Sequence, residues 1–291
     1  MRASLLCIGI LAVLLMSCEN KDYTSDSGDD LPTVVYSIED EPSLSDDREY
    51  AYFVALDTLF PGNTGLYRAR VTDPVREGLL GGSGLHSPVP SFDGTRVAFL
   101  SGSSINYLNL ADGSVVSSGV SGNYTSIIFV DDSTLIGCVG QLLYEINVDD
   151  SSVAFIGNGY DPTFYQPDVF IYLTELSTDT FGIMRYAPGS DIPQAAQADI
   201  DTLDTIISGD RVRWVSVDPS SQHYVYLIEG ADSNYVYTST IGSEDSSLVA
   251  RTRGSKVILV NHDMVLYRGG DGRLYQSDFR GNQKLPFWSM Q

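Results

Sequence analysis

Short apolar segments recur along most of the chain, and turns rich in Ser, Gly and Asp interrupt them roughly every 8–12 residues. Within these segments, apolar residues either alternate with polar ones or run continuously. No long segment keeps the 3.6-residue apolar period of an amphipathic helix, and only residues 194–198 have some helical character. This pattern predicts an all-β fold built from short strands.

One unit of roughly 40 residues repeats along the chain and holds several short strands each time, which is typical of a β-propeller. The most regular part of the unit is an apolar run centred on a bulky residue, usually Tyr. These runs occupy residues 66–71, 105–110, 143–148, 183–186, 235–240 and 274–279, and we expect them to be third strands. We therefore predict a six-bladed β-propeller of four-stranded antiparallel blades.

The other strands of each predicted blade follow from the same repeat. First strands are expected at residues 33–38, 85–89, 125–129, 163–165, 212–217 and 256–260. Second strands are nearly all apolar, which favours central strands covered on both faces, and are expected at residues 50–56, 96–100, 134–138, 169–173, 224–228 and 264–267. Fourth strands are short and polar, as edge strands should be, and are expected at residues 76–80, 114–117, 152–156, 193–195, 246–250 and 283–287.

The first residues have the pattern of an export signal rather than of a propeller blade. Arg2 supplies a positive charge, and the apolar run that follows at residues 5–16 is too short to span a bilayer as a helix. Residues 18–31 are polar, with Ser, Gly and Asp dominating, so they bury too little apolar surface to fold. We predict a signal peptide at residues 1–17, a tether at residues 18–31 and the propeller at residues 32–291.

The end of this signal, Leu15-Met16-Ser17-Cys18, resembles a bacterial lipobox. The resemblance implies cleavage before Cys18 and acylation of that cysteine by fatty acids such as palmitate, so that more than one lipid chain anchors the protein in a membrane. Glu19 follows the cysteine where an inner-membrane retention signal would carry Asp, which favours the outer membrane. We expect a lipid-anchored protein of the bacterial cell envelope, facing the periplasm or the cell surface. The alternative is an ordinary secretory signal that ends near an unrelated cysteine.

Cys138 is the one cysteine beyond this signal and the lipobox, so the mature chain has no second thiol with which to form an internal disulfide. It lies in an apolar predicted strand, and no histidine is near it in the sequence to activate it. We expect it to be a small buried apolar side chain.

The segment from Pro88 to Ser101 resembles the repeat of TolB-type propellers. In that family a Pro, an aromatic residue and Ser-Pro-Asp-Gly precede an apolar strand. The matching residues are Pro88, Ser91, Asp93, Gly94 and Phe99, whereas Pro90 and Phe92 depart from the pattern. The resemblance implies a TolB-like, WD-like repeat fold.

The sequence holds no motif that indicates catalysis or a bound cofactor. There is no G-x-S-x-G elbow, H-E-x-x-H motif, C-x-x-C pair or P-loop. By the strand assignment His223 and His262 lie on one face of the propeller and His86 lies near the other, so we expect no metal site from them. The formal net charge of −21 makes nucleic acid an unsuitable partner.

Much of the acidic charge falls in turns that share one face of the predicted propeller. One interpretation is that Asp is simply a preferred turn residue, and the other is a face that binds cations or a basic partner. The aspartates are Asp93, Asp131, Asp132, Asp168, Asp218 and Asp263 after first strands, and Asp73, Asp112, Asp149, Asp150 and Asp191 after third strands.

Aromatic residues are expected near the opposite face, where a ligand could stack on them. The alternative is that most of them pack between blades. Phe164 belongs to this group, and the candidate ligand-binding residues are Phe60, His86, Tyr124, Tyr160 and Trp214.

These observations favour an envelope lipoprotein that acts as a non-catalytic binding or protein-interaction module. Its ligand would be an envelope protein or a glycan. The first alternative is a cell-surface enzyme that acts on polysaccharides, as a lyase or a hydrolase. The second is a purely structural envelope protein whose central funnel is plugged. Propellers host all of these functions, so the fold does not decide among them.

Overall fold

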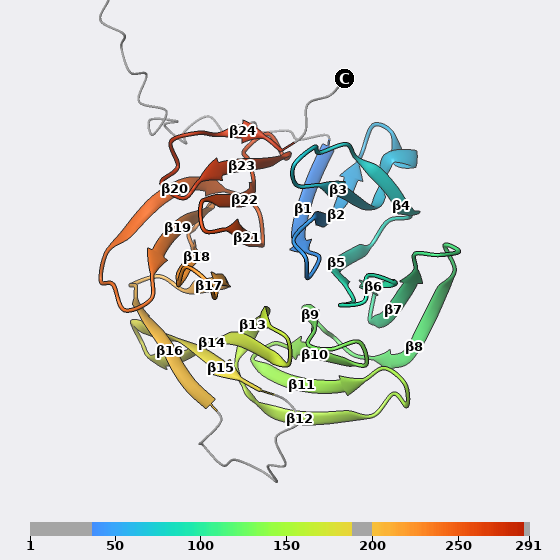
Figure 1. Cartoon of the computed structure of the whole chain (residues 1–291), viewed down its shortest axis with the longest axis horizontal. Helices are drawn as coiled ribbons and strands as arrows, with labels where there is room; N and C mark the ends of the chain where they lie inside the picture. Colours follow the sequence, from blue (N-terminus) through green and yellow to red (C-terminus); the bar gives the residue numbers. More distant parts are fainter. Residues whose placement is uncertain (1–36, 188–199, 288–291) are drawn as a thin grey trace, which may run out of the picture.

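The computed structural model describes residues 37–187 and 200–287, and these residues form a six-bladed β-propeller. Six four-stranded antiparallel sheets surround a central axis, and each sheet uses four strands that are consecutive in the sequence (Figure 1). The fold class predicted from the sequence is therefore confirmed. No helix among the described residues is long and apolar enough to cross a bilayer.

The strands of each blade are given from the innermost to the outermost. Blade 1 holds β1 (Ser37–Leu44), β2 (Tyr50–Asp57), the short 3-10 helix η3 (Pro61–Asn63), β3 (Gly65–Arg70) and β4 (Glu77–Gly81). Blade 2 holds β5 (Leu85–Pro90), β6 (Arg96–Ser101), β7 (Ser104–Asn109) and β8 (Val115–Ser121). Blade 3 holds β9 (Ser126–Phe129), β10 (Thr134–Val139), β11 (Leu142–Asn147) and β12 (Val153–Asn158).

The second half of the ring repeats this order. Blade 4 holds β13 (Tyr160–Gln166), β14 (Val169–Ser177), β15 (Thr180–Tyr186) and β16 (Ile200–Ile207). Blade 5 holds β17 (Val212–Asp218), β18 (His223–Glu229), β19 (Asn234–Thr240) and β20 (Ser246–Thr252). Blade 6 holds β21 (Val257–Asn261), β22 (Met264–Arg268), β23 (Leu274–Asp278) and β24 (Leu285–Pro286).

Three predicted strands need correction, and the third, β13, is taken up with the candidate site. The fourth strand of blade 4 is β16, whereas the sequence predicted it at residues 193–195; those residues, with the helical stretch predicted at 194–198 and with Asp191, lie outside the described residues. The first strand of blade 1 is β1, which continues to Leu44, whereas the sequence ended it at residue 38. Three acidic residues and a proline in this segment favoured a turn, but carboxylates of β1 find basic partners in the fold.

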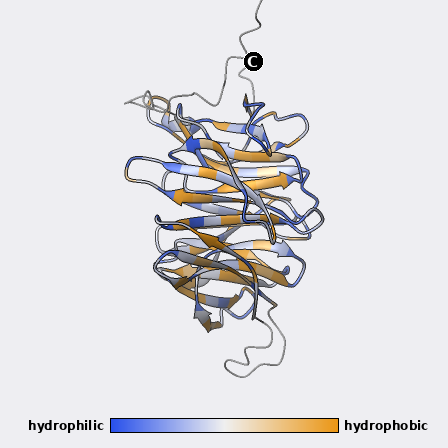
Figure 2. Cartoon of the chain, turned by 90° about the vertical axis from the view of Figure 1, so that its left-hand side faces the viewer, coloured by the Kyte–Doolittle hydropathy of each residue, from blue (hydrophilic) through white to orange (hydrophobic). Residues whose placement is uncertain are grey.

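The second strand of each blade lies in the middle of the hydrophobic core. In β6, the four residues from Val97 to Leu100 are buried, and β22 buries Val265, Leu266 and Tyr267. Both faces of such a strand must be covered, and in a propeller the neighbouring blades cover them. Figure 2 shows hydrophobic segments concentrated along the stacked strands and hydrophilic ones toward the edges of the molecule.

The repeated tyrosines of the third strands pack against aromatic rings of neighbouring strands. Tyr237 of β19 stacks on Tyr226 of β18, with ring centroids 5.6 Å apart. Tyr67 of β3 stacks on Phe53 of β2 in the same way, at 6.0 Å. Such pairs add stabilisation of about 0.5–1.5 kcal/mol beyond the area they bury. The most regular sequence signal of the repeat therefore reports packing within blades.

Blades 1 and 6 lie side by side where the ring closes, without exchanging a strand (Figure 1). The backbone N–H of Glu39 donates to the carbonyl oxygen of Gly272 at 2.7 Å, and the backbone N–H of Leu274 donates to a Glu39 carboxylate oxygen at 3.2 Å. Asp40 forms an ion pair with Arg268 at 3.0 Å. Burial raises the pKa of Asp40, and this outweighs the opposing effect of Arg268. Polar contacts of β1 thus join the two ends of the ring.

Candidate functional site

The inner strands enclose a channel along the propeller axis. We call the face where the inner strands begin the entry face, and the face that carries the turns between inner and second strands the turn face. The channel holds a cavity of about 80 Å³. Apolar side chains make most of its wall, among them Val89, Ile127, Ile258 and Leu259.

Four inner strands carry an irregularity near the entry face, and each places a non-glycine residue at positive φ. These residues are Glu41 in β1 (56°), Ser87 in β5 (48°), Asp161 in β13 (50°) and Trp214 in β17 (42°). The strand register shifts at each of them. A left-handed backbone costs a residue with a Cβ atom about 1–3 kcal/mol and persists only where its surroundings enforce it. The same distortion therefore recurs in blades 1, 2, 4 and 5.

Lys256, which directly precedes β21, joins these four residues, and we call the five together the channel floor. Its ammonium group donates a hydrogen bond to the Ser87 hydroxyl at 2.9 Å and lies 4.5 Å from the centroid of the Trp214 ring. The Ser87 backbone N–H donates to a carboxylate oxygen of Glu41. Residues of blades 1, 2, 5 and 6 are thus connected across the axis.

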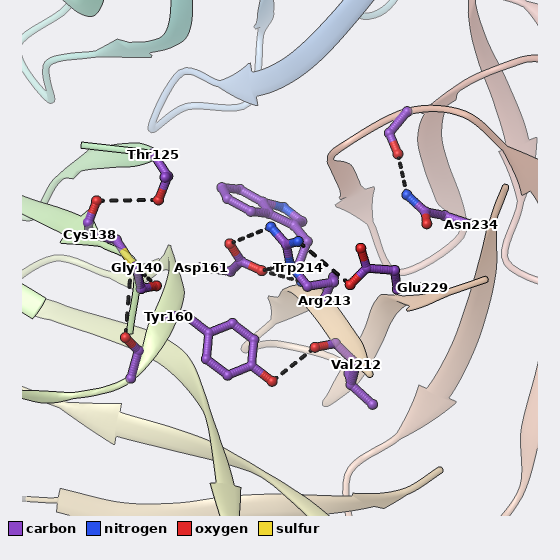
Figure 3. Close-up of polar contacts among 12 residues, drawn as sticks. Thr125, Cys138, Gly140, Tyr160, Asp161, Val212, Arg213, Trp214, Glu229 and Asn234 are labelled. Carbon is purple, nitrogen blue, oxygen red and sulfur yellow. Dashed lines mark hydrogen bonds and ion pairs between the residues drawn. The ribbon is translucent and has the colours of Figure 1, made fainter. Parts of the chain in front are cut away.

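Blade 4 joins the floor through Asp161, which Figure 3 shows beside Arg213 and Trp214. Arg213 Nε donates to Asp161 Oδ2 at 2.7 Å, and the Trp214 backbone N–H donates to the same oxygen at 3.1 Å. The Asp161 side chain is 7% exposed and the Arg213 side chain 33%, so the carboxylate is withdrawn from water while the guanidinium keeps some contact with it. The carboxylate thereby holds the start of β17 against β13.

The floor is buried, and the other end of the cavity reaches solvent. Lys256 and Trp214 are 4% and 5% exposed. At the opposite end the lining includes the exposed Asp46 and the half-buried Arg48, both from the turn between β1 and β2. Phe164 of β13 is half-buried there. The cavity therefore opens on the turn face, and we call Asp46, Arg48 and Phe164 the channel mouth.

Several buried polar atoms of the channel wall have no hydrogen-bond partner among the described residues. They include Trp214 Nε1 and Thr163 Oγ1, whose residues are each 5% exposed, and Ser43 Oγ. All three residues line the cavity. An unpaired buried polar group costs about 1–3 kcal/mol, so such atoms mark places where a bound molecule would be stabilised.

The structure does not gather the five candidate ligand-binding residues of the sequence analysis into one site. Phe60 is 65% exposed beside η3, and His86 is half-buried in β5. Tyr124 and Tyr160 belong to hydrophobic clusters between blades, and the Tyr160 hydroxyl donates to the Val212 carbonyl oxygen at 2.9 Å (Figure 3). Trp214 alone lines the cavity. Ligand binding by any of the five stays a prediction.

Phe164 lies at the opposite end of the channel from the one expected. The sequence analysis predicted that this strand starts at residue 163, which would place the Phe164 ring near the entry face. The strand in fact starts at Tyr160, so Phe164 lies near its end and pairs with Phe170. There its ring packs edge-to-face on Phe92, with centroids 5.0 Å apart.

Sequence reasoning missed Glu41, Ser87, Asp161 and Lys256. A weak signal was present, because Glu41, Ser87 and Asp161 each precede a proline at the start of an inner strand. Proline removes a backbone donor and restricts the residue before it, so a recurrent X-Pro pair in a strand indicates a bulge. No comparable signal marks Lys256.

The aspartates of the turn face mostly bond within their own turns. Asp93, Asp131 and Asp218 each accept a hydrogen bond from the backbone N–H two residues further on. At Asp131 burial raises the pKa, but the hydrogen bonds from Ser133 and Thr134 together lower it below its ordinary value. Their arrangement fits turn formation, which was one of the two interpretations of this face.

The histidines lie apart from the channel floor, whereas Cys138 lies beside it, with its thiol near the Asp161 backbone N–H. His223 Nδ1 donates a hydrogen bond to the His262 carbonyl oxygen at 3.0 Å, and its ring stacks on Phe279, on the turn face. Within the described ranges, no group of three or more His, Cys, Asp or Glu side chains has a geometry that could hold a metal ion. Cys138 is a buried free thiol whose pKa is raised by burial (Figure 3).

Solved propeller structures resemble the chain in fold. TolB from Acinetobacter baumannii matches with a TM-score of 0.53 and 16% identity, over 74% of this chain and 56% of TolB, so the chain spans little more than half of that protein. An oligogalacturonate lyase in complex with manganese matches with a TM-score of 0.52 and 12% identity, over 87% of this chain and 78% of the lyase. A chain of the nidogen/laminin complex matches with a TM-score of 0.56 and 10% identity, over 87% and 92%.

No protein-family model matches the sequence, and no curated protein matches it significantly. Likeness to solved structures at identities of 10–16% shows the TolB-like propeller fold and leaves function open.

Proposed function

We propose that this protein is a lipid-anchored binding module of the bacterial cell envelope, and that its ligand enters the central channel from the turn face. The observation that carries the proposal is the cavity itself, which has the buried Lys256 and Trp214 at one end, the exposed Asp46 at the other, and unpartnered buried polar atoms in its wall. Binding sites are typically concave, largely apolar and equipped with a few polar groups.

The channel favours a different face from the one predicted from the sequence. The entry face carries the exposed Phe60, but the residues that line the channel nearest this face, Lys256 and Trp214, are buried. A ligand approaching from the turn face instead meets Phe164 and Arg48 before it reaches Trp214. We therefore propose that the ligand enters the channel at the mouth, and not past the aromatic residues of the entry face.

The anchored part of the proposal rests on the lipobox resemblance of Leu15-Met16-Ser17-Cys18, which lies outside the described residues. Replacing Cys18 by Ala should move the protein from the membrane fraction to the soluble fraction. Mass spectrometry of the wild-type protein should find an acylated Cys18 at the amino terminus. An unmodified Cys18, or a Cys18→Ala protein that stays in the membrane, would contradict the anchor.

The channel is tested by filling it. Ser43 is half-buried in the wall, so Ser43→Phe places a ring in the cavity. Val116→Phe on the outer strand β8, where Val116 is 55% exposed, is the matched control. Immobilised wild-type and control proteins should retain the same molecule from envelope extract, identified by mass spectrometry, and Ser43→Phe should lose it while its melting temperature stays near that of the wild type. Equal retention by all three proteins would exclude the channel as the site.

The alternative is an enzyme that acts on polysaccharides. Its support is the fold shared with an oligogalacturonate lyase, and a shared fold does not fix chemistry. An oligosaccharide retained by the wild type and released shortened would favour this alternative over a binding module.

A further inference from the structure

The polar atoms around the inner end of the cavity are mainly hydrogen-bond donors. An indole N–H can only donate, and Trp214 Nε1 has no partner among the described residues. An ammonium group also only donates, and Lys256 lines the same cavity. The hydroxyls of Thr163 and Ser43 can donate as well. A ligand that satisfies this end of the channel must therefore present acceptors.

The buried charge of Lys256 is incompletely compensated. In the described part of the chain its ammonium group forms no ion pair within 4 Å, and its hydrogen-bond partner is the neutral Ser87 hydroxyl. Burial lowers the pKa of Lys256, against the opposing influence of Glu41, Asp161 and Asp40. A buried cation without a partner is costly, so an anionic group delivered to this point would be stabilised.

The carboxylates that influence Lys256 each have donors of their own. Glu41 accepts the Ser87 backbone N–H, Asp161 is paired with Arg213, and Asp40 is paired with Arg268. Those charges are therefore engaged at the edges of the floor. The Trp214 indole N–H and the Lys256 ammonium group remain for a molecule inside the cavity.

The size of the cavity limits what can reach the floor. A volume of about 80 Å³ corresponds to several water molecules, since one water needs roughly 10–15 Å³ of such space. A carboxylate with one or two attached carbons fits, whereas a sugar ring or a large side chain does not. The floor is therefore suited to a small terminal group of a ligand, and not to a whole sugar ring or a large side chain.

We propose that the channel floor binds a carboxylate group, with Lys256 and the Trp214 indole N–H as its donors. The carboxylate would come either from a small free acid or from the terminal carboxylate of a partner chain. This inference rests on the proposed function, because it specifies which ligand the channel takes.

Propionate and propionamide are the probes, since they differ little except that one is an anionic carboxylate and the other a neutral amide. In calorimetric titrations of the purified full-length protein, propionate should bind at least about tenfold more tightly than propionamide. Lys256→Met should weaken propionate binding by a similar factor. Trp214→Phe keeps a ring in place but removes the N–H, and it should weaken propionate binding while the melting temperature changes little. Equal binding of both probes, or propionate binding unchanged in Lys256→Met, would overturn the proposal.

The two sources of the carboxylate are separated with trialanine and its C-terminal amide. If the carboxylate comes from the end of a partner chain, trialanine should bind more tightly than propionate, and its C-terminal amide should bind more weakly. If it comes from a small free acid, propionate should bind and trialanine should not. Absence of binding by both propionate and trialanine would contradict a carboxylate site.

Proton uptake gives an independent readout. Glu41 and Asp40 of β1, Asp161 of β13 and Ser87 of β5 surround Lys256, and its pKa is lowered by burial. A bound carboxylate favours the protonated amine, so binding should take up protons and weaken as the pH rises. Titrations in buffers of different ionisation enthalpy measure this uptake, and uptake that persists in Lys256→Met would assign the proton to another group.

The two proposals fail in different ways. If Ser43→Phe abolishes retention of the envelope molecule but neither carboxylate probe binds, the channel is the site and its ligand is not a carboxylate. If propionate binding depends on Lys256 but retention is unaffected by Ser43→Phe, the carboxylate site stands and the proposed function is wrong.

Discussion

The turn face and the channel floor both hold acidic residues, but the hydrogen bonds of these residues span very different distances along the chain. On the turn face, Asp93 accepts hydrogen bonds from Ser91 and Thr95, each two residues away. On the floor, Asp161 accepts hydrogen bonds from residues 52 and 53 positions away, and Glu41 from a residue 46 positions away. The turn aspartates bond mainly within their own loops, although Asp132 also accepts from the Asp93 N–H of blade 2 and Asp218 lies 3.7 Å from Arg48 of blade 1. The carboxylates of the floor accept their hydrogen bonds from other blades.

The two regions also differ in how the fold affects titration. Hydrogen bonds outweigh burial at Asp93, Asp131 and Asp218 and lower the pKa of each carboxyl. Burial dominates on the floor and lowers the pKa of Lys256. The turn face should therefore lose stability at acid pH, and the floor should gain it toward alkaline pH. The many exposed aspartates, which dominate the composition, thus belong to turns. The less numerous buried charged residues belong to the channel.

The largest expected effect comes from removing a floor carboxylate. Asp161→Ala leaves Arg213 and the Trp214 backbone N–H without their acceptor, and breaking such a buried pair costs about 3 kcal/mol. Asp161→Asn keeps one acceptor oxygen and a residue type that tolerates positive φ, so it should cost less. Urea unfolding of both variants measures the difference. Equal costs would show that the negative charge, which both variants lose, and not the acceptor oxygen or the backbone conformation, is what Asp161 supplies.

The strands and the turns were largely predictable from the sequence because their signals are local. Continuous apolar runs placed β6, β10 and β18 within about one residue, and the Asp-Gly turn after β5 has a recognisable chemistry. The strand β1 was misjudged because Glu39 and Asp40 are unfavourable in an isolated strand. Their partners, Arg76 and Arg268, lie tens to hundreds of residues away.

The channel floor was not predictable for the same reason. Its residues come from five blades, and each is unremarkable in its own segment. Trp214 was singled out for its aromatic ring, but no local pattern indicates that Lys256 lies 4.5 Å from that ring. Only closure of the ring brings residues from such separated segments together around one axis.

The second largest effect is expected on the pH dependence of stability, through Lys256. Because its pKa in the folded protein is below the unfolded value of about 10.4, the unfolded chain binds the proton more tightly, and stability rises with pH between these two values. The free energy of unfolding of the wild type relative to Lys256→Met should therefore increase by up to about 1.4 kcal/mol per pH unit in that window. Urea unfolding at a series of pH values checks this. A difference independent of pH would mean that the folded protein carries an ordinary lysine.

The third largest effect is expected where blades 1 and 6 meet, since long-range contacts also stabilise the fold there. Asp40 and Arg268 are 14% and 12% exposed in their side chains and join blades 1 and 6. A double-mutant cycle of Asp40→Ala and Arg268→Ala should give a coupling energy of about 1–2 kcal/mol, as close contacting pairs do. Additive effects of the two substitutions would show that the backbone bond between Glu39 and Gly272, and not the ion pair, joins the blades.

The smallest effect is expected on the turn face. Asp93→Ala removes a carboxylate that accepts from the Ser91 hydroxyl at 2.6 Å and from the Thr95 backbone N–H at 3.0 Å, in a turn that is exposed to water. The loss should be about 1 kcal/mol, since the freed donors can bond to solvent.

The pH dependence of Asp93 has the opposite sign to that of Lys256. Burial raises the pKa of Asp93, but the hydrogen bonds from Ser91 and Thr95 lower it more, so its stabilisation is present above the unfolded pKa of about 3.9 and disappears as the pH falls through the folded value. Asp93→Asn should therefore unfold less steeply than the wild type below about pH 4, when both are followed by circular dichroism. An equally steep acid transition in Asp93→Asn would mean that other carboxylates govern acid unfolding. An Asp93→Ala cost as large as that of Asp161→Ala would remove the distinction between turn and floor carboxylates.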